Sequence, residues 1–498
     1  MEYRIYGPPG TGKTTLLVDE IIPESVKKYG QDRVMVTSFT KTAAINITQK
    51  VDLEEHMIGT LHSICYKALG SPVMAAEFIK DWNNLYPNFS TTDTNGLFAQ
   101  LQVLRAKLVP IEKWPKKIIS LYSKWKDFKQ GYNSLDFEDL IEQATHNVPV
   151  APGRPAVIIA DEVQDFTVSQ IRLLRSWGII AKELILVGDE DQSIYFFSGT
   201  TPDSFLYPEI PQDRVRVLHQ SYRIPKQVHK LASKISKKIA KRFPKEYLPR
   251  PEQGKVIRSQ GTFKQNEATI KKAIKYNTST MFLATCSYML EPIRKNMVRM
   301  GVPFSNPYRL EQKLWNPMIG KKVRGFKSFI RAGHDDHYWD LEQFIEWIVD
   351  VDFLTKDSKK LITQLATSVV TNLSGGESSR HFISKIIPTE YINQALSRDV
   401  NWLKKHTKKK MDYYIKVYNK YGKKPFFSQP DIMIGTIHSF KGAEANVCFL
   451  YPDISTAAHK ERLKSRDDLD NHRRIFYVGV TRARQVLHLM SPASKMFF

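Results

Sequence analysis

The sequence has few cysteines, no long apolar segment and a shortage of acidic residues. Its 498 residues include only three cysteines, Cys65, Cys286 and Cys448, and no two of them form a Cys-x-x-Cys pair. This spacing excludes a disulfide framework and a cysteine-rich metal site. The chain also lacks a run of about 20 apolar residues, which a membrane-spanning helix requires. We therefore expect a soluble, intracellular protein with reduced cysteines and no membrane partner.

The shortage of acidic residues leaves the chain strongly basic. Lys and Arg number 74 and Asp and Glu number 51, so the formal net charge is +23. Such an excess favours a polyanionic partner, because binding to a polyanion releases condensed counterions. Basic residues cluster at 234–242, 321–331 and 404–410. Each cluster taken alone is equally compatible with a solvated helix face.

A glycine-rich loop follows the first six residues. It matches the pattern G-x-x-x-x-G-K-[ST] and lies between a predicted strand at 3–6 and a predicted helix that begins at Thr14. Loop amides and the start of such a helix cradle phosphates. Lys13 would neutralise the terminal phosphates, and Thr14 would hold Mg²⁺. The residues that we assign to ATP binding are Gly7, Pro8, Pro9, Gly10, Thr11, Gly12, Lys13, Thr14 and Thr15.

Two carboxylates directly follow a predicted buried strand at 156–160. They are Asp161 and Glu162, in the segment Asp-Glu-Val-Gln-Asp. The carboxyl ends of parallel strands are the edge of a sheet where ligands bind. In combination with the glycine-rich loop, we expect Asp161 to complete the Mg²⁺ site. Glu162 would orient or deprotonate the attacking water.

A third polar segment follows the apolar run at 184–187. It contains Gln192, whose amide could sense a γ-phosphate by hydrogen bonding, and the aromatic residues Tyr195 and Phe197. Aromatic side chains at this position could stack on the bases of a nucleic acid. They are equally compatible with packing in the core.

The order of apolar runs and helical patterns predicts several structural units. Short apolar runs that alternate with helices indicate buried parallel sheets. A second α/β block starts near 215–218, includes the strand candidate 280–284, and resumes at 432–435 and 447–451. The stretches 70–135 and 305–430 are mainly helical, and the first contains no convincing strand. The predicted domains are 1–69 with 136–214, a helical insertion at 70–135, 215–304 with 431–498, and an insertion at 305–430.

These motifs, in this order, resemble the UvrD/Rep-like branch of superfamily 1 helicases. Further segments fit the same pattern, namely 36–44, 59–63, 136–140, 220–223, 435–444 and 476–484. By this resemblance Tyr222 stacks on adenine, Arg223 reaches the γ-phosphate and Arg482 is a second arginine finger. Glu444 belongs to the nucleotide site. The residues that the resemblance assigns to single-stranded DNA are Phe39, Thr60, His62, Tyr195, Phe197 and His438.

The resemblance implies an α/β fold with two RecA-like P-loop domains, each with a parallel sheet and a mainly helical insertion. It also implies an ATP-dependent DNA helicase that needs Mg²⁺ and moves 3′→5′ on single-stranded DNA. Junctions of single-stranded and duplex DNA would be its substrates, and replication or repair proteins its partners. The cytoplasm or nucleoid, or the interior of a virus-infected cell, would be its location.

The chain departs from the family pattern at several positions. The segment with a glutamine that reads adenine usually precedes the phosphate loop, and the six residues before Gly7 are too few to contain it. Phe197 replaces a tryptophan, and Thr42 replaces a lysine. The second insertion looks shorter than usual, and no nuclease domain is expected after 484. These differences predict altered nucleotide preference and altered strand affinity.

Three other functions are compatible with parts of the sequence. An RNA-directed motor of the same superfamily would use the same phosphate and stacking contacts. A clamp stimulated by nucleic acid would bind ATP and DNA without unwinding, although Glu162 and Arg482 argue against an inactive site. A small-molecule P-loop kinase would explain the phosphate loop alone.

Overall fold

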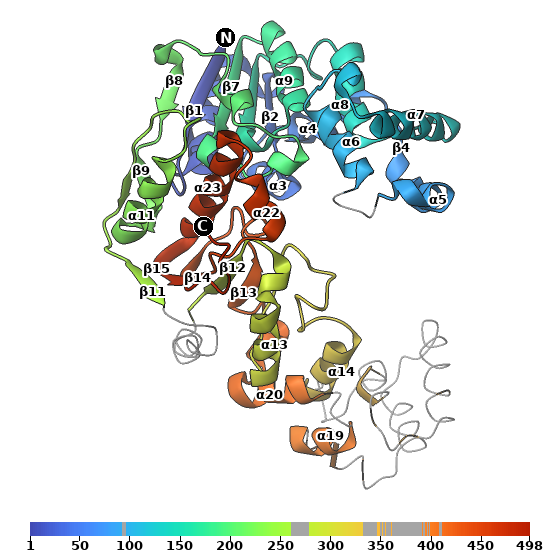
Figure 1. Cartoon of the computed structure of the whole chain (residues 1–498), viewed down its shortest axis with the longest axis vertical. Coiled ribbons are helices and arrows are strands. Elements are labelled where there is room, and N and C mark those ends of the chain that lie inside the picture. Colours follow the sequence, from blue (N-terminus) through green and yellow to red (C-terminus); the bar gives the residue numbers. More distant parts are fainter. Residues whose placement is uncertain are drawn as a thin grey trace. The chain divides into compact units, whose positions relative to one another are not determined.

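The computed structural model describes most of the chain. The described residues are 1–91, 96–259, 278–331, 399–407 and 411–498, with a few positions between 346 and 397. Two compact units are present, the first formed by Met1–Val256, Ser455–Val486 and Phe498, and the second by Ile257–Ile454 and Leu487–Phe497. Figure 1 labels their helices and strands. The described residues do not include most of 332–398, which is part of the insertion predicted at 305–430. They also do not include 408–410 of the basic cluster at 404–410.

A six-stranded parallel sheet is the centre of the first unit. Its order is β3-β2-β6-β7-β1-β8, and each neighbouring pair is parallel. The strands are β1 Glu2–Tyr6, β2 Val34–Ser38, β3 Ile58–Thr60, β6 Val157–Asp161, β7 Glu183–Gly188 and β8 Val215–Val217. This order brings the carboxyl ends of β1, β6 and β7 together at one edge, which is the ligand-binding edge of such sheets.

The central strands β6 and β7 of this sheet carry apolar residues on both faces. In β6, Val157 and Ile159 belong to one core cluster, and Ile158 and Ala160 belong to another. Successive side chains of a strand point to opposite faces, so each face has its own core. Burial on both faces explains the continuous apolar run in the sequence. Each fully buried Val or Ile side chain contributes about 1.5–3 kcal/mol to folding.

Helices cover both faces of the sheet. The helix predicted from Thr14 begins at Lys13 and continues through a π-helical turn, η1, which the sequence pattern did not indicate. Outside residues 70–135, the α-helices of the first unit and the turn η1 are α1 Lys13–Leu16, η1 Leu17–Ile21, α2 Ile22–Tyr29, α3 Lys41–Thr48, α4 Leu61–Ala68, α8 Phe137–Asn147, α9 Val168–Ile180, α10 Asp203–Leu206, α11 Lys226–Ser236, α22 Thr456–Glu461 and α23 Arg466–Val480.

The stretch 70–135 is helical, with an aromatic core of its own. Its helices are α5 Ile79–Leu85, α6 Leu97–Ala106 and α7 Lys116–Gly131. Trp82, Trp114 and Trp125 pack together in this core. The prediction that the stretch has no strand is wrong, because β4 Val73–Met74 pairs in parallel with β5 Ser134–Leu135. Two-residue strands are too short to produce a period-2 pattern in the sequence.

The strand at Val215–Val217 does not open a second sheet. As β8 it pairs in parallel with β1, with Arg4 opposite Val215, and forms the edge of the first sheet. The prediction that a second α/β block starts at 215–218 is therefore wrong, because this strand pairs with the first sheet. The next strand, β9 Gln220–Pro225, pairs only with β10 Leu248–Arg250 among the described strands. Sequence order alone does not reveal which strand a short apolar run joins.

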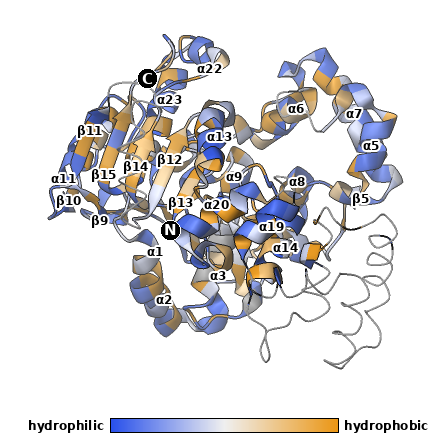
Figure 2. Ribbon diagram, turned by 90° about the horizontal axis from the view of Figure 1, so that it is seen from below, coloured by the Kyte–Doolittle hydropathy of each residue, from blue (hydrophilic) through white to orange (hydrophobic). Residues whose placement is uncertain are grey.

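A second sheet has five strands in the order β11-β15-β14-β12-β13, and its strands β12, β13 and β14 belong to the second unit. The strands are β11 Lys255–Ser259, β12 Thr280–Ala284, β13 Ile432–Thr436, β14 Ala445–Leu450 and β15 Ala483–Met490. Strand β12 pairs in parallel with both of its neighbours. The strands predicted at 280–284, 432–435 and 447–451 are confirmed within one or two residues. Figure 2 shows β12 and β14 mainly in hydrophobic colours, as expected for central strands.

A helical group with a separate core belongs to the second unit. Its described helices are α13 Glu291–Met300, α14 Lys321–Ile330, α19 Val400–His406, α20 Asp412–Tyr421 and α21 Lys424–Phe427. Phe326, Phe329, Leu403, Ile415 and Phe426 meet in this core.

The parallel strand pairs in both sheets confirm the predicted α/β fold class. The division into two domains with two insertions is finer than the two compact units and stays a prediction. Among the described residues, no helix combines the length and the apolar character that crossing a bilayer would need.

Candidate functional site

The glycine-rich loop connects β1 to α1 and has the backbone of a phosphate-binding loop. Gly10 and Gly12 have φ angles of 75° and 80°, in the left-handed region that favours glycine. A Cβ at Gly10 would lie 2.3 Å from the Cβ of Arg223, so only glycine fits there. The amide of Gly7 donates to the carbonyl of Gly188 over 2.9 Å, which attaches the loop to the end of β7. Lys13 lies over the loop, with Nζ 3.1 Å from the carbonyl oxygen of Gly7.

Asp161 and Glu162 lie beside this loop, as the sequence predicts. The hydroxyl of Thr14 donates to Oδ2 of Asp161 over 3.5 Å. Lys13 Nζ is 3.6 Å from Oε1 of Glu162. Burial, together with the negative charge of Glu162, raises the pKa of Asp161 to about 7. Glu162 has φ 54° and ψ 42°, a left-handed conformation that a residue other than glycine adopts only at some energetic cost.

Hydrogen bonds connect Glu162 to Asp189, which follows the next strand of the sheet. Gln164 donates from Nε2 to Oε2 of Glu162 over 2.5 Å. Its Oε1 accepts the backbone N–H of Asp189 over 2.9 Å. Gln164 is thus a site residue to which the sequence analysis gave no role. It stands in the same acidic segment, and its burial next to two strand ends could not be read from that segment.

Gln192 and Arg482 meet in the same unit. Gln192 donates from Nε2 to Oδ2 of Asp189 over 2.8 Å. Arg482 donates from Nη2 to Oε1 of Gln192 over 3.3 Å, and its Nε donates to the carbonyl of Val478 over 2.9 Å. Arg482 is only 1% exposed. Arg482 therefore contacts Gln192, the predicted γ-phosphate sensor, although it lies 290 residues later in the sequence.

The segment with Tyr222 and Arg223 is hydrogen-bonded to the phosphate loop. The Ser221 hydroxyl donates to the carbonyl of Pro9 over 2.8 Å, and the Tyr222 amide donates to the carbonyl of Gly10 over 2.8 Å. Tyr222 is 70% exposed. A Cβ at Gly12 would lie 4.0 Å from Cε2 of Tyr222, so the ring is beside the loop. This location suits a residue that stacks on the base of a bound nucleotide.

Three aromatic residues assigned to nucleic acid form one cluster. The rings of Phe39 and Tyr195 are stacked, with centroids 5.6 Å apart and an interplanar angle of 25°. Phe197 lies edge-on to Tyr195 at 6.0 Å and is 58% exposed. Tyr195 and Phe39 are half-buried. Part of the cluster is exposed to solvent, so these side chains are not packed only in the core.

Thr60 and His62 have local structural roles. Oγ1 of Thr60 accepts the backbone N–H of Ser63 over 3.2 Å and caps α4. The His62 ring lies edge-on to Phe137 at 5.4 Å, and burial lowers the pKa of His62 to about 4. His62 is therefore neutral at physiological pH. Its contact with a nucleic acid stays a prediction.

The remaining predicted residues, His438 and Glu444, belong to the second unit. They lie between β13 and β14, in a turn whose first residue, Thr436, accepts the backbone N–H of Ser439 over 3.2 Å. Thr60 caps α4 with the same bond. The roles of His438 and Glu444 also stay predictions.

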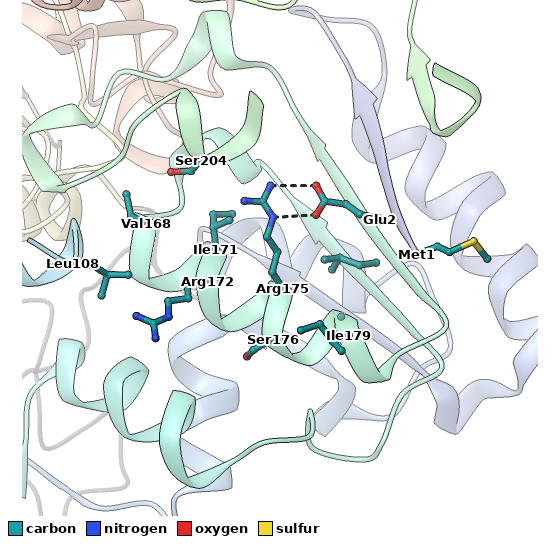
Figure 3. A pocket seen from close by; sticks show the side chains of 12 residues that line it. Met1, Glu2, Leu108, Val168, Ile171, Arg172, Arg175, Ser176, Ile179 and Ser204 are labelled. Carbon is teal, nitrogen blue, oxygen red and sulfur yellow. Dashed lines mark hydrogen bonds and ion pairs between the residues drawn. The ribbon is translucent and has the colours of Figure 1, made fainter. Parts of the chain in front are cut away.

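A cavity of about 690 Å³ lies elsewhere in the first unit (Figure 3). Arg175 and Glu2 form an ion pair at its wall, with Nε 3.0 Å from Oε2. The lining residues are Met1, Glu2, Leu108, Val168, Ile171, Arg172, Arg175, Ser176, Gly178, Ile179, Leu184 and Ser204. None of them is a predicted site residue.

Comparisons with known proteins show which families and proteins the sequence resembles. A family model for an AAA domain matches residues 3–198, and a model for the UvrD-like helicase C-terminal domain matches residues 340–494. The ATP-dependent DNA helicase Rep of Buchnera aphidicola subsp. Acyrthosiphon pisum is 23% identical over 351 residues, which cover 59% of this chain and 54% of Rep. A second Buchnera aphidicola Rep, from subsp. Schizaphis graminum, is 26% identical over 309 residues, 52% of this chain and 46% of that Rep. This chain therefore spans about half the length of these two relatives.

A longer match extends over nearly the whole chain. The ATP-dependent DNA helicase PcrA of Staphylococcus epidermidis is 21% identical over 607 aligned positions, which cover 98% of this chain and 81% of PcrA. The two family models match ranges that contain the phosphate loop and Arg482, respectively. Together, the two family models and these relatives support a UvrD/Rep-like superfamily 1 DNA helicase.

Proposed function

We propose that this protein is an ATP-driven motor that moves 3′→5′ along single-stranded DNA and separates duplex strands. One observation carries the proposal. A path of side-chain and backbone contacts leads from Lys13 through Glu162, Gln164 and Asp189 to Gln192, three residues before the aromatic residue Tyr195. A change in the bound nucleotide can therefore be transmitted through these contacts to the loop after β7, which carries Tyr195.

The nucleotide side of the site is suited to hydrolysis of ATP. Lys13 supplies positive charge beside the phosphate loop, and Arg223 and Arg482 supply more from later segments. Such charges stabilise the transition state of phosphoryl transfer more than the ground state. Glu162 is the general base, because its carboxylate is held by Lys13 and Gln164 at the end of β6. Gln192 and Arg482 are the residues that distinguish ATP from its products.

The residues beside the phosphate loop also fit Mg²⁺. Thr14 Oγ1 and Asp161 Oδ2, which lie 3.5 Å apart, are hard oxygen ligands of the kind that this ion prefers. We propose that these two side chains hold Mg²⁺. The ion would supply positive charge to the phosphates of ATP.

The aromatic cluster is the proposed grip on the strand. Phe39 comes from the loop after β2, and Tyr195 and Phe197 come from the loop after β7. Bases can stack on the accessible face of this cluster. When hydrolysis removes the charge that Gln192 and Arg482 contact, the same loop can shift Tyr195 and change its contact with the base. Repeated changes of grip would move the strand.

The relatives' names favour DNA over RNA, since Rep and PcrA are named ATP-dependent DNA helicases. The 3′→5′ direction rests on the family resemblance. ATPase stimulation by single-stranded DNA and by RNA of the same length distinguishes the two substrates. Equal or stronger stimulation by RNA would contradict the proposal. Replication or repair proteins are the proposed partners, and the cell interior, where DNA lies, is the proposed location.

Replacing the exposed aromatics should weaken the grip on the strand. We expect Tyr195→Ala or Phe197→Ala to cost about 1–3 kcal/mol per lost stack, which is about 5- to 150-fold in DNA affinity. Basal ATPase activity without DNA should change by less than about twofold, because neither ring belongs to the nucleotide site. Fluorescence anisotropy with labelled oligonucleotides measures the affinity. The control is Tyr207→Ala, which removes a 54% exposed ring outside the cluster. Unchanged affinity in both cluster variants would refute the stacking role.

A further inference from the structure

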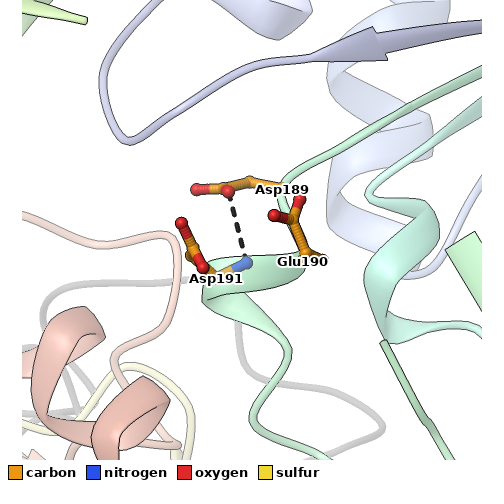
Figure 4. Close-up of side chains that lie close together, drawn as sticks. All are labelled: Asp189, Glu190 and Asp191. Atoms are coloured by element: carbon orange, nitrogen blue, oxygen red, sulfur yellow. Dashed lines mark hydrogen bonds between the residues drawn. The ribbon is translucent and has the colours of Figure 1, made fainter. Parts of the chain in front are cut away.

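A buried lysine outside the predicted motifs contacts the acidic loop after β7. Nζ of Lys245 lies 3.1 Å from the carboxylate of Asp189, 2.5 Å from that of Glu190 and 3.1 Å from that of Asp191. The lysine side chain is 1% exposed, and the three carboxylates are 0–1% exposed. Figure 4 shows the three carboxylates close together at the start of the short helix after β7. This loop leads directly into Gln192.

Two arginines also contact this loop, one through an ion pair and one through a hydrogen bond to the backbone. Arg242 donates to Asp191 from Nε over 3.1 Å and from Nη2 over 2.8 Å. Arg474, on α23, donates from Nε to the backbone carbonyl of Glu190 over 3.1 Å. The three carboxylates are close enough together to hold a metal ion, but the ammonium group of Lys245 already lies among them. Their charge is therefore balanced by cations of this chain.

Asp189 links this network to the nucleotide sensor. Its Oδ1 pairs with Lys245, and its Oδ2 accepts the Nε2 donor of Gln192 over 2.8 Å. An ionised carboxylate can only accept hydrogen bonds, so the NH₂ group of Gln192 must point toward Asp189. The carbonyl oxygen of the same amide then points toward Arg482, which donates to it over 3.3 Å. Lys245 fixes Asp189, and Asp189 fixes the orientation of Gln192.

We propose that Lys245 is a positioning residue of the ATPase site, which orients the γ-phosphate sensor Gln192 through Asp189. This inference rests on the proposed function, since it assigns Lys245 to the same hydrolysis reaction. Lys245 and Arg242 lie in the segment between α11 and β10, which carries none of the family motifs quoted above. The segment would thus take part in the site through Asp189. Arg242 supports the same loop through Asp191.

The test is a double-mutant cycle between Lys245 and Gln192. Lys245→Met keeps an unbranched side chain but removes the charge. We expect it to lower DNA-stimulated kcat by about 10- to 100-fold, because a misplacement near 1 Å in a catalytic group costs about that much. KM for ATP should stay within about twofold. In a Gln192→Ala background the same change should lower kcat by less than about twofold, since no sensor remains to be oriented.

An equal fold-loss of kcat in both backgrounds would overturn the inference, as would a rise in KM with unchanged kcat. Thermal unfolding shows whether Lys245→Met is folded at the assay temperature. If Lys245→Met is not folded, Arg242→Gln replaces it in the same cycle. The Arg242 side chain is 16% exposed, and its substitution removes only one partner of Asp191. We expect Arg242→Gln to lower kcat in the parent but not in the Gln192→Ala background. The same loss of kcat in both backgrounds would count against the inference.

Lys241→Met is the matched control on the same segment. Its side chain is 43% exposed and pairs with Asp203 and Asp467 instead of the acidic loop. We expect unchanged kcat, and a loss as large as that of Lys245→Met would contradict the positioning role. The parent protein separates the two claims. A parent without DNA-stimulated ATPase activity refutes the proposed function, whereas an active parent with additive losses refutes only the role of Lys245.

Discussion

Glu162→Gln should lower DNA-stimulated ATP turnover by about 10²- to 10⁴-fold, the usual contribution of a general base. The amide has nearly the same shape as the carboxylate but cannot accept a proton from the attacking water. Lys13 and Gln164 contact Glu162, so the variant loses the ion pair with Lys13, whose Nζ lies 3.6 Å away. Nucleotide binding should be retained, because the backbone amides of the phosphate loop and the hydrogen bond from Gly7 to Gly188 do not involve this carboxylate.

Steady-state ATPase assays with saturating single-stranded DNA measure this loss, and binding of a fluorescent nucleotide measures the retained affinity. The matched control is Glu112→Gln, which changes an exposed glutamate of the helical stretch 70–135. The control should keep the parent's turnover. Turnover of Glu162→Gln close to that of the parent would show that another group activates the water.

The second large effect is expected for Arg482→Lys. An arginine finger contributes about 10³–10⁵ to the rate of phosphoryl transfer in enzymes that use one. Lysine keeps the positive charge but loses the planar fork, so we expect kcat to fall by about 10²-fold or more. In this structure the guanidinium group of Arg482 makes two separate hydrogen bonds. Its Nε donates to the carbonyl of Val478, and its Nη2 donates to Gln192. A lysine has one donor group and cannot make both contacts from the same position.

Arg484→Lys is the control for this substitution. It makes the same chemical change two residues further along, at a half-buried position in β15. We expect Arg484→Lys to retain turnover, and single-turnover ATPase measurements compare the chemical step in the two variants. Equal effects of both substitutions would mean that Arg482 has no special role in the reaction.

The sequence is most informative where a motif is local. The phosphate loop needs glycines at 10 and 12 because both have positive φ angles, and β6 and β7 are apolar because both faces of their sheet are buried. Asp161 is the last residue of the buried strand β6, and Gln192 lies in the short segment after the buried strand β7. Because the strands are parallel, their carboxyl ends meet at one edge and place these residues beside the loop. A pattern of short segments was therefore sufficient to predict which residues come together.

Tertiary pairing explains what the sequence did not show. The short strand at 215–217 gives no sign of its partner, and it joins β1 instead of beginning a new sheet. Lys245 lies in a run of basic residues, where a solvated or polyanion-binding role is the ordinary expectation. Its burial among three carboxylates depends on how the segment after α11 packs on the loop after β7. No periodicity or spacing in the sequence reports such a contact.

The aromatic residues are an intermediate case. The sequence was equally compatible with stacking on bases and with core packing for Tyr195 and Phe197. In the structure they share a cluster with Phe39, from a segment more than 150 residues earlier, and Phe197 is 58% exposed. Exposure is a property of the packed chain, so it could not be predicted from residue type. It is the observation that favours a binding role.

The most direct test of the proposed motor is strand displacement on duplexes with a single-stranded tail at the 3′ or the 5′ end. The account predicts ATP-dependent displacement from 3′-tailed duplexes, little displacement from 5′-tailed or blunt duplexes, and none with Glu162→Gln. A strict requirement for a 5′ tail would contradict the direction of movement. DNA-stimulated ATPase activity without displacement of any of these duplexes would contradict strand separation.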